Sequence, residues 1–89
     1  MDQREQYKAV MSEIIAKQSI ILGPDMSIMR AKKISGIEIG EKGEVVNIEG
    51  DPAEALERLI GTYVELSGQI VKNAIGSIFT KYPEIKQVS

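Results

Sequence analysis

The residues best suited to chemistry are the acidic side chains between positions 37 and 51. They include Glu38, Glu41, Glu44 and Glu49, and carboxylate oxygens are the ligands that divalent cations such as Ca²⁺ prefer. Their spacing does not match that of a calcium-binding loop. Glu38 and Glu41 also differ in strand parity, so a strand would point them to opposite faces. We therefore expect a solvated acidic hairpin and no metal-binding residues.

The rest of the composition argues against catalysis. The chain of 89 residues contains no His and no Cys, which removes the commonest general base, thiolate nucleophiles, disulfides and Cys-based zinc sites. Asp25 and Asp51 are each explained as the cap of a predicted helix. A carboxylate at that position also repels the anions that a helix N-terminus otherwise binds. We predict that the protein is not an enzyme and has no catalytic or cofactor-binding residues.

Three basic residues, Arg30, Lys32 and Lys33, lie together near the end of the second predicted helix. Two short helices, a hairpin and a long C-terminal helix resemble the layout of winged helix-turn-helix repressors, in which such residues would contact DNA. However, residues 37–51, which would form the wing, carry five acids against one base, Lys42. A phosphate backbone would repel that wing. Nucleic-acid binding through these three residues is therefore kept only as an alternative.

Length and composition indicate one soluble domain spanning residues 1–89. Apolar residues make up 43% and charged residues 27%, with a net charge of −2, as is typical of globular chains. No stretch approaches the ~18 uninterrupted apolar residues of a membrane span, and the first residues do not resemble a signal peptide. We expect a cytoplasmic protein with no membrane partner. Because so small a domain has a thin stability margin, oligomerisation is a common remedy.

The helix signals divide the first part of the chain into two helices. The spacing of Asp2 and Glu5 predicts a capped start, and apolar residues at a 3.6-residue period continue until Gly23 and Pro24. A second, shorter helix is predicted from about Asp25 to residue 34, with Asp25 as its cap. Residue 36, a glycine, lies where a left-handed C-cap belongs.

From residue 37 to residue 48 the apolar period changes to two, which predicts a β-hairpin with its turn at Gly43. Pairing Gly40 with Val45 leaves Glu38 and Asn47 on one face. The same register collects four β-branched side chains on the other face, which we expect to be buried against the long helix: Ile37, Ile39, Val46 and Ile48.

The strongest helix start in the chain is formed by Asp51, Pro52 and Glu54 at the N-cap, N1 and N3 positions. Nothing stops the pattern before Tyr82, which predicts one helix of about 30 residues, or ~45 Å. Its apolar arc covers roughly 180°, nearly twice what one neighbour requires. Gly61 and Gly68 lie a heptad apart at one edge of that arc, which indicates close approach of another backbone.

These features predict an α+β fold, helix, helix, β-hairpin and long helix, in a small and mostly helical domain that forms a homodimer. The expected dimer interface consists of Val64, Ser67, Gly68, Val71, Ile75 and Phe79. The predicted function is that of a non-catalytic, homodimeric interaction or regulatory module without a cofactor. A small-ligand sensor domain and the winged-helix-like DNA-binding regulator are the alternatives.

Overall fold

The part of the chain that the structure describes folds as four helices and one antiparallel hairpin, which confirms the α+β prediction. The computed structural model describes residues 3–83 and 85. The elements follow in the order α1 (Gln3–Leu22), α2 (Pro24–Lys32), β1 (Ile37–Ile39), β2 (Val45–Ile48), α3 (Pro52–Ser67) and α4 (Gln69–Lys81).

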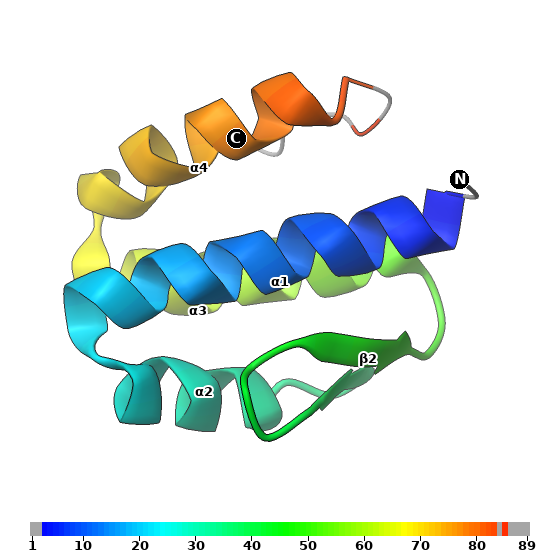
Figure 1. Cartoon of the computed structure of the whole chain (residues 1–89), viewed down its shortest axis with the longest axis horizontal. Helices are drawn as coiled ribbons and strands as arrows, with labels where there is room; N and C mark the ends of the chain where they lie inside the picture. The colour runs from blue at the N-terminus through cyan, green and yellow to red at the C-terminus, as the bar shows by residue number, and fades with distance from the viewer. Residues whose placement is uncertain (1–2, 84, 86–89) are drawn as a thin grey trace.

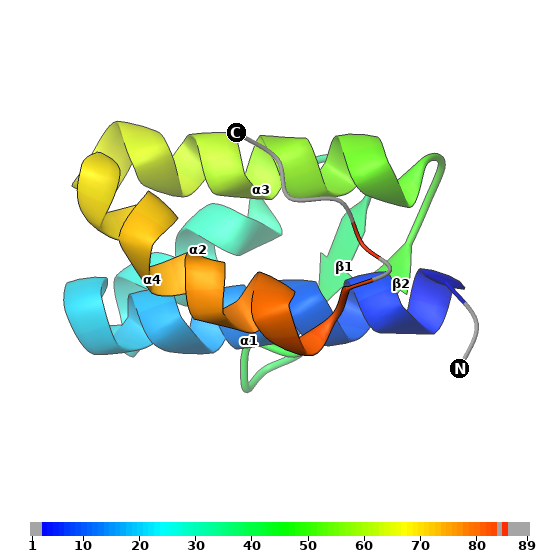
Figure 2. The same cartoon turned by 90° about the horizontal axis from the view of Figure 1, so that it is seen from above.

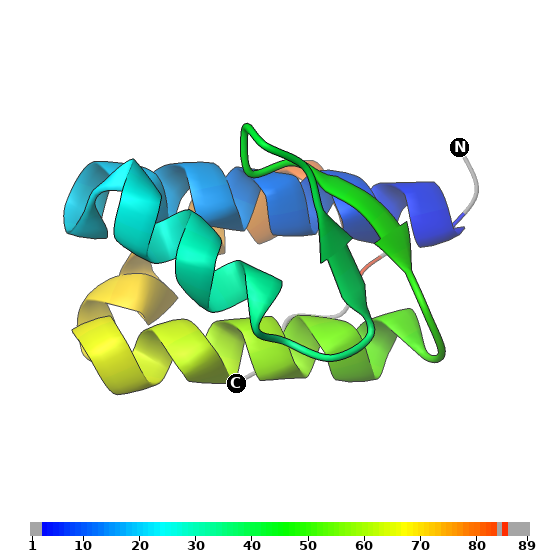
Figure 3. The same ribbon diagram turned by 90° about the horizontal axis from the view of Figure 1, so that it is seen from below.

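The elements form three layers around the central helix α1 (Figure 1). Helices α1 and α3 lie side by side in the middle layer, and α4 covers one side of the pair (Figure 2). Helix α2 and the hairpin cover the opposite side (Figure 3). The body measures 30 × 25 × 18 Å between Cα atoms. Within the described residues, no helix combines the length and apolar character needed to cross a bilayer.

The first two helices meet at the predicted Gly23–Pro24 boundary. Gly23 adopts a φ of 91°, which side chains disfavour, and Pro24 supplies the first residue of α2. The prediction that Asp25 caps α2 is wrong, because the N-cap is Gly23 and Asp25 lies in the first helical turn. Lys33 is the C-cap of α2, so Gly36 lies beyond it, where its carbonyl accepts the Glu49 amide at 2.8 Å. The predicted cap at Asp2 lies outside the described residues.

The open end of the hairpin has the predicted register. Ile37 pairs with Ile48, and Glu38 pairs with Asn47. The two isoleucines are buried while Glu38 and Asn47 are exposed, so the alternation of apolar and polar residues identified this part correctly.

A β-bulge changes the register nearer the turn. Ile39 pairs with Val45, not with the predicted Val46, because the register shifts between residues 38 and 39. As a result Val45 is 6% exposed and Val46 is 44% exposed. The Val45 amide donates a hydrogen bond to the Ser12 hydroxyl of α1 at 2.9 Å. The prediction that Val46 belongs to the buried face is therefore wrong, since one extra residue reverses the parity of the strand.

The main contacts of the hairpin are with α1 and α2, and not with the predicted long helix. Arg4 of α1 donates a hydrogen bond from Nη1 to the Ile48 carbonyl at 2.7 Å. At the turn, Gly43 is buried so closely that an added Cβ would lie 3.1–3.2 Å from Ile28 and Ile15. The hairpin is thus held on the first two helices.

The predicted long helix is two helices. The chain breaks at Gly68, whose φ of 64° and ψ of −137° belong to a region that essentially only glycine occupies. The Gly68 amide still donates to the Val64 carbonyl at 2.7 Å, and α4 begins directly afterwards. Helix α4 then folds back over α1 and α3 (Figure 2).

Burial explains why two helices are more stable than one. A straight helix would carry the apolar side chains of α4 away from the body, whereas the fold buries four large ones: Val71, Ile75, Ile78 and Phe79. Burying each is worth about 1.5–3 kcal/mol, so the group contributes on the order of 6–12 kcal/mol. The few helical hydrogen bonds lost at the break cost only about 0.5–1.5 kcal/mol each.

Candidate functional site

The six residues predicted for a dimer interface have two different environments. Val71, Ile75 and Phe79 are buried within a single chain, because α4 folds onto α1 and α3. Val64, Ser67 and Gly68 are partly buried around the α3–α4 turn. A second copy could reach the first three only by displacing α4, so the interface argued from a continuous helix loses half of its members. The oligomeric state itself stays a prediction.

The predicted basic cluster contributes two of its three residues to a groove between α2 and α3. The groove is open to solvent and has a volume of about 460 Å³. Lys32 is exposed but does not line the groove. The lining residues are Arg30, Lys33, Ile34 and Ser35 on one side and Arg58, Gly61, Thr62 and Glu65 on the other.

Helical spacing places these side chains on facing walls. On α3, residues 58, 61, 62 and 65 follow the i, i+3, i+4, i+7 pattern of a single helix face. Residues 30, 33 and 34 repeat that pattern around the C-terminal end of α2. Gly61 has no side chain to project into the groove, and an added Cβ at this position would find no atom within 4 Å.

The groove carries three cationic side chains against one carboxylate, that of Glu65. Arg58 donates from Nη1 to the Ser35 carbonyl at 3.2 Å, and its Nη2 lies 3.7 Å from a Glu54 carboxylate oxygen. Arg30 and Lys33 form no ion pair with another described residue. Two exposed cations are therefore available to an anionic group in the groove.

One end of the molecule collects most of the exposed apolar side chains. Seven large apolar residues are exposed in the described part of the chain. Six of them belong to the last turn of α1, to α2, or to the α3–α4 turn, and the seventh is Val46 on the hairpin. The end of α1, the start of α2 and the α3–α4 turn lie at the same end of the molecule (Figures 1 and 3). We call this surface the apolar end: Ile20, Ile21, Met26, Met29, Leu66 and Ile70.

Buried polar contacts hold the helices together beneath the apolar end. The Tyr63 hydroxyl of α3 donates to the Ser27 carbonyl of α2 at 2.8 Å, and burial raises the pKa of Tyr63 to about 12. The Ser67 hydroxyl lies 3.5 Å from the Gln18 carbonyl oxygen on α1. Gln18 Nε2 and Ser27 Oγ are buried without a hydrogen-bond partner among the described residues.

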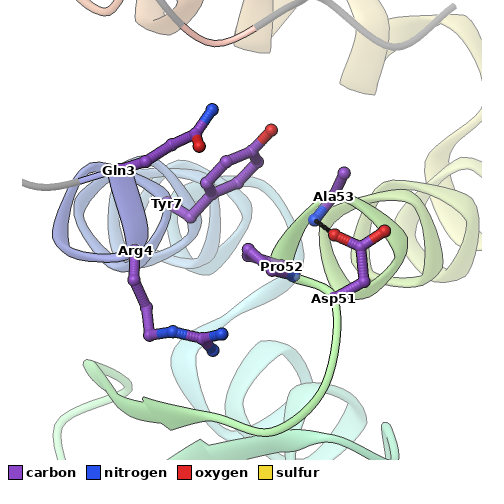
Figure 4. A pocket seen from close by; sticks show the side chains of 6 residues that line it. All are labelled: Gln3, Arg4, Tyr7, Asp51, Pro52 and Ala53. Carbon is purple, nitrogen blue, oxygen red and sulfur yellow. Dashed lines mark hydrogen bonds between the residues drawn. The ribbon is translucent and has the colours of Figure 1, made fainter.

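Two other hollows offer less to a ligand. A hollow of about 430 Å³ lies between the N-terminal ends of α1 and α3, where Gln3, Arg4, Tyr7 and Asp51 meet (Figure 4). Its charged groups already have partners within the fold. Arg4 donates to two backbone carbonyls, and Asp51 Oδ1 accepts the Ala53 amide at 3.1 Å.

The second hollow, of about 230 Å³, is lined by Gly36, Ile37, Glu38 and Glu49. It lies on the hairpin that the sequence predicts to be acidic and solvated. Four glutamates of this region are exposed to solvent: Glu38, Glu41, Glu44 and Glu49. No group of three or more His, Cys, Asp or Glu residues suited to a metal ion occurs in the described chain.

Three titratable side chains join the C-terminal end of α4 to α1. Glu13 accepts hydrogen bonds from the Lys81 ammonium and, at 2.8 Å, from the Tyr82 hydroxyl. The Lys81 hydrogen bond is the main reason that the pKa of Glu13 falls below its ordinary value. Partial burial acts in the opposite direction, and the Tyr82 hydrogen bond lowers the pKa further. The same contact raises the pKa of Lys81. Because Glu13 is held as a carboxylate facing a cation, the cluster closes the fold and does not resemble a general acid or base.

Sequence reasoning did not single out Arg58, which lines the α3 side of the groove. The available signal was the arrangement of Arg58, Thr62 and Glu65 at i, i+4 and i+7, with Gly61 between them. Only the packing of α2 against α3 shows which neighbour that face meets.

No family model, curated protein or solved structure matches this chain.

Proposed function

We propose that this protein is a non-catalytic interaction module that binds another protein through its apolar end. The observation that carries this proposal is the gathering of six of the seven exposed large apolar side chains at one end of the described chain. Ile20 is 86% exposed and Ile70 is 56% exposed. Exposed apolar residues scattered over a surface are ordinary on soluble proteins, whereas their concentration in one region is typical of an interaction surface.

The dimensions of the apolar end favour a partner that also contacts a second face. The two shorter extents of the body are 25 and 18 Å, so an end face covers on the order of 450 Å². Two copies meeting end to end would bury about 900 Å² in total, below the roughly 1,200–2,000 Å² of stable interfaces. An end-to-end homodimer would therefore be weak, and a partner that extends along the side of the molecule gains more area.

Site-specific photocrosslinking tests this proposal. The photoreactive residue p-benzoylphenylalanine replaces Ile20 or Ile70 at the apolar end, or Val46 as the matched control, which is exposed on the hairpin. We expect irradiation in the source cells to give one adduct of defined mass from positions 20 and 70 and none from position 46.

The mass of the adduct distinguishes the occupants. An adduct of twice 9.8 kDa would identify a second copy and would replace the proposed partner with the predicted homodimer. Equal adducts from all three positions, or none from positions 20 and 70, would contradict an interaction surface at the apolar end.

A further inference from the structure

We propose that the groove between α2 and α3 binds the acidic part of a partner segment whose apolar part docks on the apolar end. This inference rests on the proposed function and specifies the chemistry of the partner. The partner would be a protein segment in which apolar side chains are followed by carboxylates.

A single face of α2 leads from the apolar end into the groove. Met26, Met29, Arg30 and Lys33 occupy the i, i+3, i+4 and i+7 positions, which share one side of a helix. The two methionines are exposed members of the apolar end, and the two cations line the groove. At 1.5 Å per residue the surface changes from apolar to basic over about 10 Å.

The facing wall, on α3, changes in the same direction. Leu66 belongs to the apolar end, and Arg58 lies two turns earlier in the groove. Two hydrogen bonds fix this register between the helices. The Tyr63 hydroxyl meets the Ser27 carbonyl toward the apolar end, and Arg58 Nη1 meets the Ser35 carbonyl toward the basic part.

The charges favour an acidic protein segment over a nucleic acid. The groove carries three cations and one carboxylate, that of Glu65, and only Arg30 and Lys33 form no ion pair with another described residue. So small an excess of positive charge suits one or two carboxylates better than the continuous phosphates of a nucleic acid. The chain has a net charge of −2, and its hairpin carries exposed acids, so the surface lacks the broad positive potential of a nucleic-acid binder. Exposed methionines beside the cations add an adaptable apolar contact that suits side chains better than phosphates.

Three labelled synthetic helical peptides test the inference by fluorescence anisotropy. They share one apolar face of leucines and carry Glu, Gln or Lys in the following turn. We expect the Glu peptide to bind most tightly and the Lys peptide most weakly.

Two variants with the same charge change identify the groove. Because Lys33→Glu replaces an attraction with a repulsion, it should weaken binding of the Glu peptide about tenfold and strengthen binding of the Lys peptide. Lys32→Glu is the matched control, since it makes the same change on the same helix outside the groove, and it should alter binding less than about twofold.

The outcomes separate this inference from the proposed function. Suppose that all three peptides bind equally, and that Ile70→Ser weakens their binding while Val46→Ser does not. The acidic specificity of the groove is then wrong, and the proposed binding surface at the apolar end is supported. If Lys33→Glu reverses the order of peptide affinities but Ile70→Ser has no effect, the groove is supported as the site for acidic groups and the apolar end is contradicted as a binding surface. If no peptide binds, or if a thymidine oligonucleotide binds in a Lys33-dependent way and the Glu peptide does not, the inference is overturned.

Discussion

Replacing Gly68 with alanine tests whether residues 52–81 form two helices or one. Gly68 has a φ of 64° and a ψ of −137°, a combination that costs a residue with a side chain about 1–3 kcal/mol. An added Cβ at Gly68 would find no atom within 4 Å, so the cost comes from the backbone alone. We therefore expect Gly68→Ala to destabilise the fold by about 1–3 kcal/mol.

Gly61→Ala and Gly76→Ala are the matched controls. Both glycines lie inside helices without a positive φ, and an added Cβ at either position meets no atom within 4 Å. Alanine should stabilise each helix by about 0.5–1 kcal/mol. For a chain of 89 residues, 1 kcal/mol corresponds to about 5 °C in melting temperature. Gly68→Ala should therefore melt about 5–15 °C below wild type, and each control about 3–5 °C above it.

Thermal unfolding followed by circular dichroism gives the sign of each change. A continuous helix would make Gly68 an ordinary interior glycine, so a stabilising Gly68→Ala would refute the break. Small-angle X-ray scattering detects a variant in which α3 and α4 join into one straight helix without global unfolding. Helix α4 would then leave α1, the radius of gyration would rise above the 11.6 Å of the Cα trace, and the buried face of α4 would bind a hydrophobic dye.

Three further predictions concern the core and its charges. Tyr63→Phe should cost about 1 kcal/mol by removing the buried hydrogen bond to the Ser27 carbonyl. It should also abolish a loss of stability between pH 10 and about pH 12, where Tyr63 ionises in the unfolded chain before it does in the fold. Because the fold lowers the pKa of Glu13 below 4.5, its stabilisation should be lost as the pH falls through that lowered pKa, and Glu13→Gln should flatten the acid limb in urea titrations. Val45→Ser should cost about 2 kcal/mol in urea unfolding and Val46→Ser close to nothing; equal costs would contradict the bulge.

Several element boundaries could be predicted because they depend on the chemistry of single residues. Pro24 and Pro52 lack an amide donor and fix φ, which favours the first position of a helix and disfavours its interior, and each begins a helix here. Asp51 caps α3 through the Ala53 amide as predicted. The absence of His and Cys likewise excludes whole classes of chemistry without reference to the fold.

The inner half of the hairpin could not be predicted in the same way. Alternation located the strands and the pairing of Ile37 with Ile48. Either Val45 or Val46 could face inward, since both are β-branched and apolar. The bulge that selects Val45 accompanies a hydrogen bond to Ser12, which lies on a helix more than thirty residues earlier.

Most core residues and most helix boundaries follow from local properties of the chain, namely side-chain polarity, periodicity and the chemistry of prolines and caps. The reversal at Gly68 depends on long-range packing, because that glycine is compatible with a helix and with a break. The choice depends on whether α1 and α3 are present to cover the apolar face of α4. The groove has the same origin, since Lys33 and Arg58 are distant in sequence and become neighbours only when α2 packs against α3. Burial depends on the assembled neighbours, and a local pattern does not specify them.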